Sequence, residues 1–121
     1  MKYLLIVSKI KQVISRLDKD ISFLSNALTD KKINIFIINQ YEKGYKLFTK
    51  GKENLFNIIN KSINSSIEIE RIKNREFVLT KSYFIDIYYQ LKNSNLDLSI
   101  KCRLIVSRLE ELINLLDSMK A

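Results

Sequence analysis

Apolar residues recur at alternating spacings of four and three positions near both ends of this chain. A 3.5-residue repeat keeps one side of a helix against a neighbouring helix over several turns. The pattern therefore predicts two long helices with coiled-coil-like packing. The first repeat comprises Tyr3, Val7, Ile10, Ile14, Leu17, Ile21, Leu24 and Leu28, and the second comprises Leu98, Cys102, Ile105, Leu109, Leu112, Leu116 and Met119.

A second helix is predicted after the first repeat. Thr29 and Asp30 are capping residues, so we expect the first helix to end there and the next to run from about Lys31 to Lys50. Gly51 is typical of a helix end, and the sequence leaves open whether residues 53–63 continue the second helix past a kink. The predicted inward side chains are Ile33, Ile37, Ile38, Tyr41, Tyr45 and Phe48.

A third helix is predicted from a capping box at Ser65-Ser66-Ile67-Glu68, in which a hydroxyl and a carboxylate satisfy two free backbone donors. It would begin near Ser66 and run to about Lys92. Residues 93–95 are turn formers that break it, and Asn95 or Asp97 caps the last helix. The predicted buried side of the third helix is Phe77, Phe84, Ile87, Tyr88 and Leu91.

One competing pattern indicates short strands. Residues 33–38 and 67–70 are β-branched and partly alternating, but both runs lie inside longer stretches with helical spacing. The chain has no proline and only two glycines, so little interrupts a helix. We therefore predict an all-α, up-down bundle of four long helices in a single domain spanning residues 1–121, with the second helix continuous or broken near Gly51.

Length and cysteine content bear on stability and location. A chain of 121 residues can bury a core without disulfides, and the single thiol, Cys102, occupies an apolar repeat position typical of core packing. A lone cysteine fits a reducing compartment. Residues 3–7 are apolar, but this run is too short for a signal-peptide core or a membrane span. We expect a cytoplasmic protein without a transmembrane segment.

The positive charge is concentrated in the first half of the chain. Residues 1–61 hold 12 Lys/Arg against 5 Asp/Glu, whereas residues 62–121 hold 9 against 8. A positive field attracts polyanions, so nucleic acid, an acidic protein surface and an anionic membrane are the candidate partners. The chain is also rich in Ile, Asn and Lys, whose codons are AT-rich, so genomic composition is an alternative source of the lysines.

The residues that most enzymes need are scarce. The chain has no histidine and one cysteine, which excludes Ser-His and Cys-His nucleophile pairs and His- or Cys-rich zinc sites. Carboxylates between residues 68 and 76 lie among basic side chains at spacings of three and four residues, so we expect solvated salt bridges there. We predict a non-catalytic protein with no cofactor and no metal site. The charged residues of this segment are Glu68, Glu70, Arg71, Lys73, Arg75 and Glu76.

A basic line on the second helix is the best candidate binding site. Lys43, Lys46 and Lys50 fall at i, i+3 and i+7 and therefore share one helix face, and Lys52 follows Gly51. Such a line can contact a phosphate backbone with release of counterions. A solvated face of an ordinary amphipathic helix is the alternative interpretation.

A second basic line lies on the first helix, where Lys2, Lys9 and Arg16 recur at seven-residue intervals. Two tyrosines, Tyr41 and Tyr45, lie on the helix face next to the first line. Aromatic rings can stack on bases, although tyrosines at helical spacing more often belong to a core.

Four segments of the predicted third and last helices share a pattern with a known family: Arg75–Leu79, Tyr83–Ile85, Leu91–Lys92 and Leu104–Leu112. Together they resemble the four-helix-bundle family of rRNA intervening-sequence proteins, whose relatives include the accessory variability proteins of diversity-generating retroelements. The resemblance covers about residues 30–119. It implies a non-enzymatic bundle, and for the retroelement members a basic ring-shaped pentamer that binds a reverse transcriptase and its template RNA. The chain has Thr29-Asp30-Lys31-Lys32 where that family has a Phe-Pro-Lys motif.

Two function classes follow from the sequence. The favoured one is an oligomer-forming accessory protein that binds RNA or a ribonucleoprotein. The other is a small immunity or inhibitor protein, from a bacteriocin system or a mobile element, that acts by protein–protein contact. The first class requires a basic surface whose binding weakens with salt, and the second requires an apolar patch.

Overall fold

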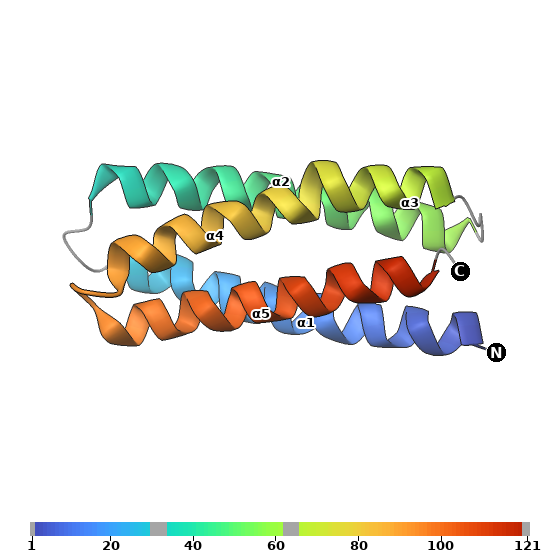
Figure 1. Cartoon of the computed structure of the whole chain (residues 1–121), viewed down its shortest axis with the longest axis horizontal. Helices are drawn as coiled ribbons and strands as arrows, with labels where there is room; N and C mark the ends of the chain where they lie inside the picture. Colours follow the sequence, from blue (N-terminus) through green and yellow to red (C-terminus); the bar gives the residue numbers. More distant parts are fainter. Residues whose placement is uncertain (1, 30–33, 62–65, 120–121) are drawn as a thin grey trace.

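The computed structural model describes residues 2–29, 34–61 and 66–119, which form an antiparallel bundle of four long helices (Figure 1). None of these residues is in a strand, and residues 35–38 and 67–70 are helical. The predicted all-α, up-down bundle is therefore confirmed. In chain order the elements are α1 (Lys2–Thr29), α2 (Ile35–Asn60), α3 (Ser66–Ile72), the π-helical turn η1 (Lys73–Phe77), α4 (Val78–Leu91) and α5 (Leu96–Met119).

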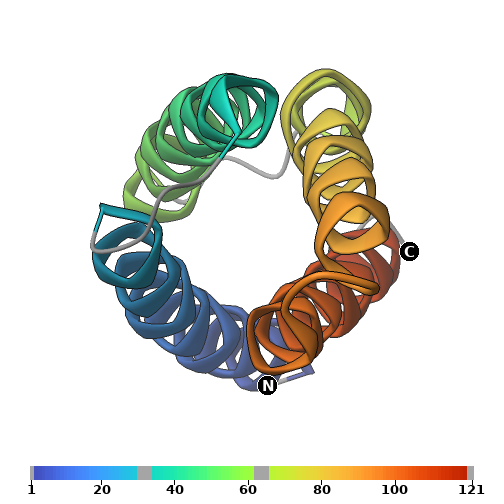
Figure 2. The ribbon, with the colours of Figure 1, turned by 90° about the vertical axis from the view of Figure 1, so that its left-hand side faces the viewer.

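The helices surround a common axis (Figure 2), and α3, η1 and α4 follow one another without a break as the third helix of the bundle. α1 packs mainly on α5, and α2 packs mainly on α4. No helix within the described ranges is both long enough and apolar enough to cross a membrane.

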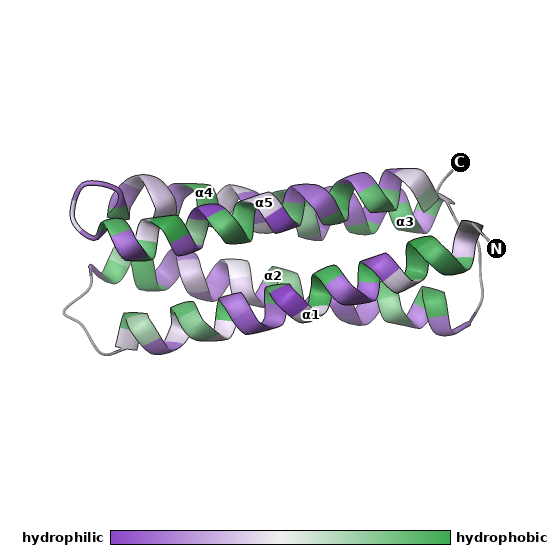
Figure 3. Ribbon diagram, turned by 90° about the horizontal axis from the view of Figure 1, so that it is seen from below, coloured by the Kyte–Doolittle hydropathy of each residue, from purple (hydrophilic) through white to green (hydrophobic). Residues whose placement is uncertain are grey.

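The two repeats found in the sequence contribute the α1 and α5 sides of the core, and α2 and the third helix supply the rest. Every residue of both repeats is buried except Tyr3, which is half-buried. Figure 3 shows apolar segments recurring along each helix between hydrophilic ones. The prediction that both repeats form long helices packed along a neighbouring helix is confirmed.

Helix ends follow local capping. α1 ends at Thr29, as predicted, and the Thr29 hydroxyl donates to the Asn26 carbonyl oxygen at 2.8 Å. α2 begins at Ile35, because the Asn34 side chain accepts a hydrogen bond from the Phe36 N–H at 2.8 Å. The start predicted at Lys31, the cap Asp30, and Ser65 of the capping box lie outside the described residues. The predicted cap at Asn95 is confirmed, since its Oδ1 accepts from the Leu98 N–H at 3.2 Å.

Of the two alternatives that the sequence left open for the second helix, the continuous one is observed, and the end expected near Lys50 is wrong. α2 continues without interruption to Asn60, and Gly51 is buried in its middle. A Cβ at this position would lie 2.8 Å from Glu76 Cβ and 3.0 Å from the Phe77 ring, so glycine is required for a close approach of two helices. Gly44, one heptad earlier, is also buried and takes the inward position predicted for Tyr45, which is 49% exposed.

The third helix contains one more inward residue than a regular heptad pattern allows. Two buried series, each with spacings of three and four, follow one another with no gap between Glu76 and Phe77. Consecutive residues in an α-helix point about 100° apart, so both cannot face the same seam. The wider turn η1 resolves this conflict, and the Val78 N–H bonds to the Lys73 carbonyl oxygen five residues back. The series are Ile69, Ile72 and Glu76, and then Phe77, Thr80, Phe84, Ile87 and Leu91.

We predict that changing Ile14 or Leu109 to Ala lowers the free energy of unfolding by about 2–5 kcal/mol, because each change removes buried surface and leaves a cavity. Both side chains are buried, at 2% and 0% exposure. Urea denaturation followed by circular dichroism measures the loss. Ile100, which is 55% exposed on α5, provides the control, and Ile100→Ala is expected to change stability by less than about 0.5 kcal/mol. Losses below about 0.5 kcal/mol at both core positions would contradict the bundle packing.

We also predict that Gly51→Ala is destabilising. Alanine favours a helix interior by about 1 kcal/mol over glycine, but overpacking against Glu76 and Phe77 costs about 1–3 kcal/mol. Gly44→Ala is the matched control, because its Cβ would meet Phe84 Cε2 at the longer distance of 3.1 Å. In thermal or urea unfolding, the Gly51→Ala variant is expected to be less stable than the Gly44→Ala variant. An increase in stability for Gly51→Ala would show that the helices do not approach closely there.

Candidate nucleic-acid interface

The predicted basic line on α2 is present for three of its four members. Lys43, Lys46 and Lys50 are exposed and form no ion pair within 4.0 Å among the described residues. Lys52 points instead toward α1, where its Nζ lies 3.0 Å from Asp18 Oδ1. The face of α2 that carries the line is therefore Lys43, Lys46 and Lys50, and Lys52 belongs to the α1–α2 contact.

Lys50 lies at a groove of about 390 Å³ between α2 and the third helix, here called the α2–α3 groove. α2 contributes Lys50, Asn54 and Asn57 to its polar lining, and the third helix contributes Glu68, Arg71, Arg75 and Glu76. Cationic side chains thus face the groove from both walls. From the sequence we expected Arg71 and Arg75 to form solvated salt bridges within their own helix. Their position across a groove from Lys50 depends on how the helices pack and could not be predicted from that local pattern.

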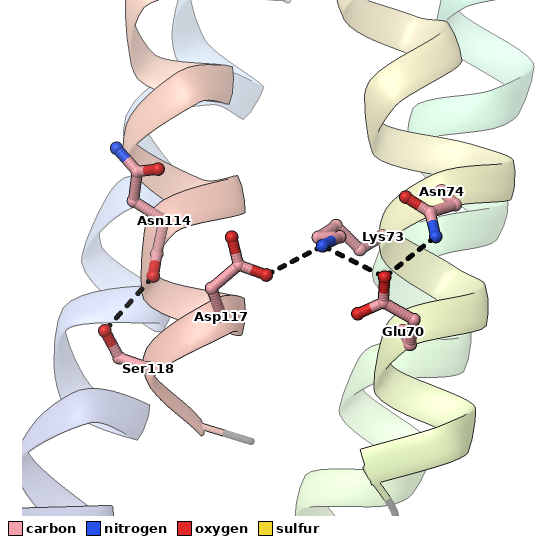
Figure 4. A network of polar contacts seen from close by, with 6 residues as sticks. All are labelled: Glu70, Lys73, Asn74, Asn114, Asp117 and Ser118. Atoms are coloured by element: carbon pink, nitrogen blue, oxygen red, sulfur yellow. Dashed lines mark hydrogen bonds and ion pairs between the residues drawn. The ribbon is translucent and has the colours of Figure 1, made fainter. Parts of the chain in front are cut away.

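The basic residues of the third helix divide between two sides. Lys73 points to α5, where its Nζ lies 2.7 Å from Asp117 Oδ1 and 3.2 Å from Glu70 Oε1 (Figure 4). This pairing joins η1 to α5. Arg71 on the groove side pairs with Glu68 at 3.3 Å, and both side chains are about half exposed. Arg75 forms no ion pair within 4.0 Å among the described residues.

The expectation of solvated salt bridges is confirmed for Glu68 and Glu70 and is wrong for Glu76. Glu76 is only 6% exposed, because it occupies the extra inward position of η1 beside Gly51. Its Oε1 accepts a long hydrogen bond of 3.5 Å from Asn54 Nδ2, and its buried Oε2 has no hydrogen-bond partner in the described part of the chain.

Two half-buried residues share this feature, since Tyr3 Oη and Gln40 Oε1 are also buried without a hydrogen-bond partner among the described residues. The two other polar residues of the core are satisfied. The Thr80 hydroxyl donates to the Glu76 carbonyl oxygen at 2.7 Å, and the Ser99 hydroxyl donates to the Leu96 carbonyl oxygen at 2.7 Å. Leaving a buried acceptor unsatisfied costs about 1–3 kcal/mol, and more if it is charged. Of the three buried polar residues Glu76, Thr80 and Ser99, only Glu76 has a side-chain acceptor that stays unsatisfied among the described residues.

The second basic line lies on a different side of the bundle. Lys9 and Arg16 are exposed on α1, and the side chain of Lys2 lies outside the described part. Asp20 pairs with Arg108 of α5, Nε to Oδ2 at 2.9 Å, and so marks the side of α1 that faces α5. Arg16 precedes Asp20 by one helical turn and shares that side. The two basic lines therefore do not form one continuous surface.

The tyrosines do not extend the basic line either. The Tyr41 hydroxyl donates to the Ile21 carbonyl oxygen of α1 at 3.1 Å, and its ring stacks on Tyr45 with centroids 6.1 Å apart. Burial raises the pKa of Tyr41 above its usual value. Tyr41 thus serves the α1–α2 contact.

Two other features of the molecule do not add a reactive site. Cys102 is fully buried, and burial raises the pKa of its thiol to about 12, which keeps it protonated and unreactive near neutral pH. A smaller groove between α4 and α5 holds Tyr88, Tyr89 and Arg103, but the Arg103 guanidinium already lies 5.9 Å from the Tyr88 ring centroid. Among the described residues, no group of three carboxylate or thiol side chains is placed to hold a metal ion.

A closer reading of the sequence signals could have located Glu76. Counting back from Leu91 in steps of four and three along the apolar face of α4 gives Phe77 as the inward residue. Counting forward from Ile69 and Ile72 in the same way gives Glu76 instead. This one-residue offset is the signature of an inserted residue. The pairing of Asn54 with Glu76 and the position of Arg75 opposite Lys50 depend on how α2 and η1 pack, and no local pattern indicates them.

Comparisons with family models, with curated proteins and with solved structures find no match to this chain.

Proposed function

We propose that this chain is a non-catalytic accessory protein that binds single-stranded RNA in the α2–α3 groove and along the neighbouring face of α2. The observation that carries the proposal is that Lys50 and Arg75 face one groove from opposite walls without an acidic partner within 4.0 Å among the described residues. Lys43 and Lys46 extend this positive surface along α2.

A single-stranded nucleic acid fits this surface better than a duplex. A groove between two helices can admit one backbone together with its bases, and cations on both walls can contact successive phosphates. Lys43 and Lys46 would hold the strand where it leaves the groove. The resemblance to the intervening-sequence family points to the same class of partner, an RNA or a reverse-transcriptase complex.

Assembly and location are part of the proposal. We propose a cytoplasmic homo-oligomer, so that several basic faces engage one RNA and affinity rises through multivalency. Light-scattering mass together with the 260/280 nm absorbance ratio of the purified protein tests oligomer and co-purified nucleic acid in one measurement.

The direct test reverses the charge of the basic line. The triple variant Lys43→Glu, Lys46→Glu, Lys50→Glu is expected to remain folded, because exposed charges contribute little to stability. It is expected to bind single-stranded RNA more weakly, with a slope of log affinity against log salt that is flatter by about two units, at about 0.7 per phosphate contact. Fluorescence anisotropy across a salt series measures both quantities.

A matched control changes the same amount of charge elsewhere. Lys9, Lys11 and Arg16 are all exposed on α1, and their reversal to Glu alters the net charge equally. The α1 variant is expected to lose affinity for RNA only because the net positive charge of the protein is lower. Its slope of log affinity against log salt is expected to change less than that of the α2 variant. Equal effects of the two triple variants, or no effect of either, would remove the α2 face as the RNA site.

A second function is favoured by a separate observation. Exposed apolar side chains occur in the last two turns of α1 and in the first turns of α2 and α5, and these helix ends lie at the same end of the bundle (Figure 1). Exposed apolar residues there suit the immunity or inhibitor class acting by protein–protein contact. A protein of that class would purify free of nucleic acid and would lose its partner on Phe23→Ser or Ile100→Ser. The apolar residues are Phe23, Ile35, Phe36, Leu96 and Ile100.

A further inference from the structure

The α2–α3 groove combines a buried carboxylate with cationic walls, and few ligands suit both. Glu76 is more than nine-tenths buried, lines the groove, and has one carboxylate oxygen with no hydrogen-bond partner among the described residues. An ionised carboxylate can only accept hydrogen bonds, so the missing partner is a donor. Rotation about the terminal torsion of Glu76 exchanges its two oxygens, because that torsion is broad and roughly two-fold.

The position of Glu76 in the chain indicates that it is not a packing residue. It is the extra residue of η1, and the seam on either side would be continuous without it. Single π-helical turns inside α-helices occur frequently at functional sites. Here the turn places a carboxylate where an α-helix would place the next core residue, and Gly51 supplies the space beside it.

The walls of the groove restrict what can donate to this carboxylate. A metal ion, or an ammonium or guanidinium group of a partner protein, would satisfy Glu76 but would be repelled by Lys50 and Arg75, while Glu68 and Arg71, which also line the groove, neutralise each other. A ligand that meets both requirements has neutral N–H donors and carries its negative charge a short distance away. A nucleotide has this combination in its base and its phosphate.

Among the four RNA bases, the donor pattern of guanine fits best. Guanine presents N1–H and the N2 amino group side by side, and a carboxylate can accept from both at once. On the corresponding edge of adenine, cytosine and uracil, each donor is flanked by an acceptor that would face the carboxylate. Bases of single strands are commonly recognised through this edge, with Arg planes stacked on their faces.

We propose, on the basis of the function proposed above, that the α2–α3 groove is a guanine nucleotide site. In it Glu76 accepts from N1–H and the N2 amino group, Asn54 turns from Glu76 toward the base, and Lys50 and Arg75 bind the adjoining phosphates, whereas Arg71 keeps its ion pair with Glu68. The groove volume of about 390 Å³ lies within the range of small-molecule sites.

The experiment compares three labelled ten-nucleotide RNAs that consist of uridine except for one central guanosine, adenosine or inosine. Inosine keeps N1–H and lacks only the N2 amino group. Anisotropy titrations with the full chain are expected to give about tenfold tighter binding for guanosine than for adenosine, with inosine in between. Unlabelled guanosine monophosphate and unlabelled guanosine-containing RNA are used as competitors. Displacement by the mononucleotide assigns the site to the free nucleotide, and displacement by the RNA alone assigns it to the strand.

The variant Glu76→Gln is expected to abolish the preference for guanosine while affinity for the adenosine RNA stays the same or rises, because a negative charge is removed near the phosphates. Glu53→Gln is the matched control, since Glu53 is exposed on α2 and carries the same charge. It is expected to keep the preference.

Equal affinities for the three RNAs, or a preference that survives Glu76→Gln, would overturn the guanine site and leave RNA binding by the basic line intact. Absence of any salt-dependent RNA binding would instead overturn the proposed function. The inosine comparison uses the unaltered protein, so the proposal stays testable even if Glu76→Gln fails to fold.

Discussion

The third helix buries two consecutive residues, Glu76 and Phe77, against the same neighbouring helices. The positions of the side chains that line the α2–α3 groove depend on this constraint. An α-helix cannot meet this requirement, because neighbouring side chains diverge by about 100°. The π-helical turn η1 meets it by adding one residue to a turn, so that α3 and α4 keep their common packing direction. Gly51 is the counterpart on α2, since any side chain there would meet Glu76 and Phe77.

The packing of η1 against Gly51 also determines which side chains lie at the surface groove. The close approach at Gly51 brings η1 against the middle of α2, so Arg71 and Arg75 stand across a groove from Lys50. On its other side η1 is held to α5 by Lys73 and Asp117. One wall of the groove is therefore packed against α2 and joined to α5 by an ion pair.

The extent to which sequence anticipated this structure differs between core and site. The seams of α1 and α5 were predictable residue by residue, because a long 3.5-residue repeat has only one way to face a neighbour. Gly51 was misinterpreted, since a glycine that allows close helix contact and one that ends a helix look alike in sequence. We predicted that Glu76 is exposed to solvent, because charged residues are almost never buried. For that reason the one-residue offset between the two buried series at Phe77 was not recognised in the sequence.

The central claim is that Glu76 is an inserted residue whose buried carboxylate is retained at a cost to stability. The most direct measurement is the free energy of unfolding of a variant lacking Glu76, determined by urea denaturation. Without this residue the buried series becomes continuous from Ile69 to Leu91, the π-helical turn is no longer required, and an unsatisfied acceptor disappears. We predict a gain of about 1–3 kcal/mol over the unaltered protein. A variant that is less stable than the unaltered protein would contradict the claim.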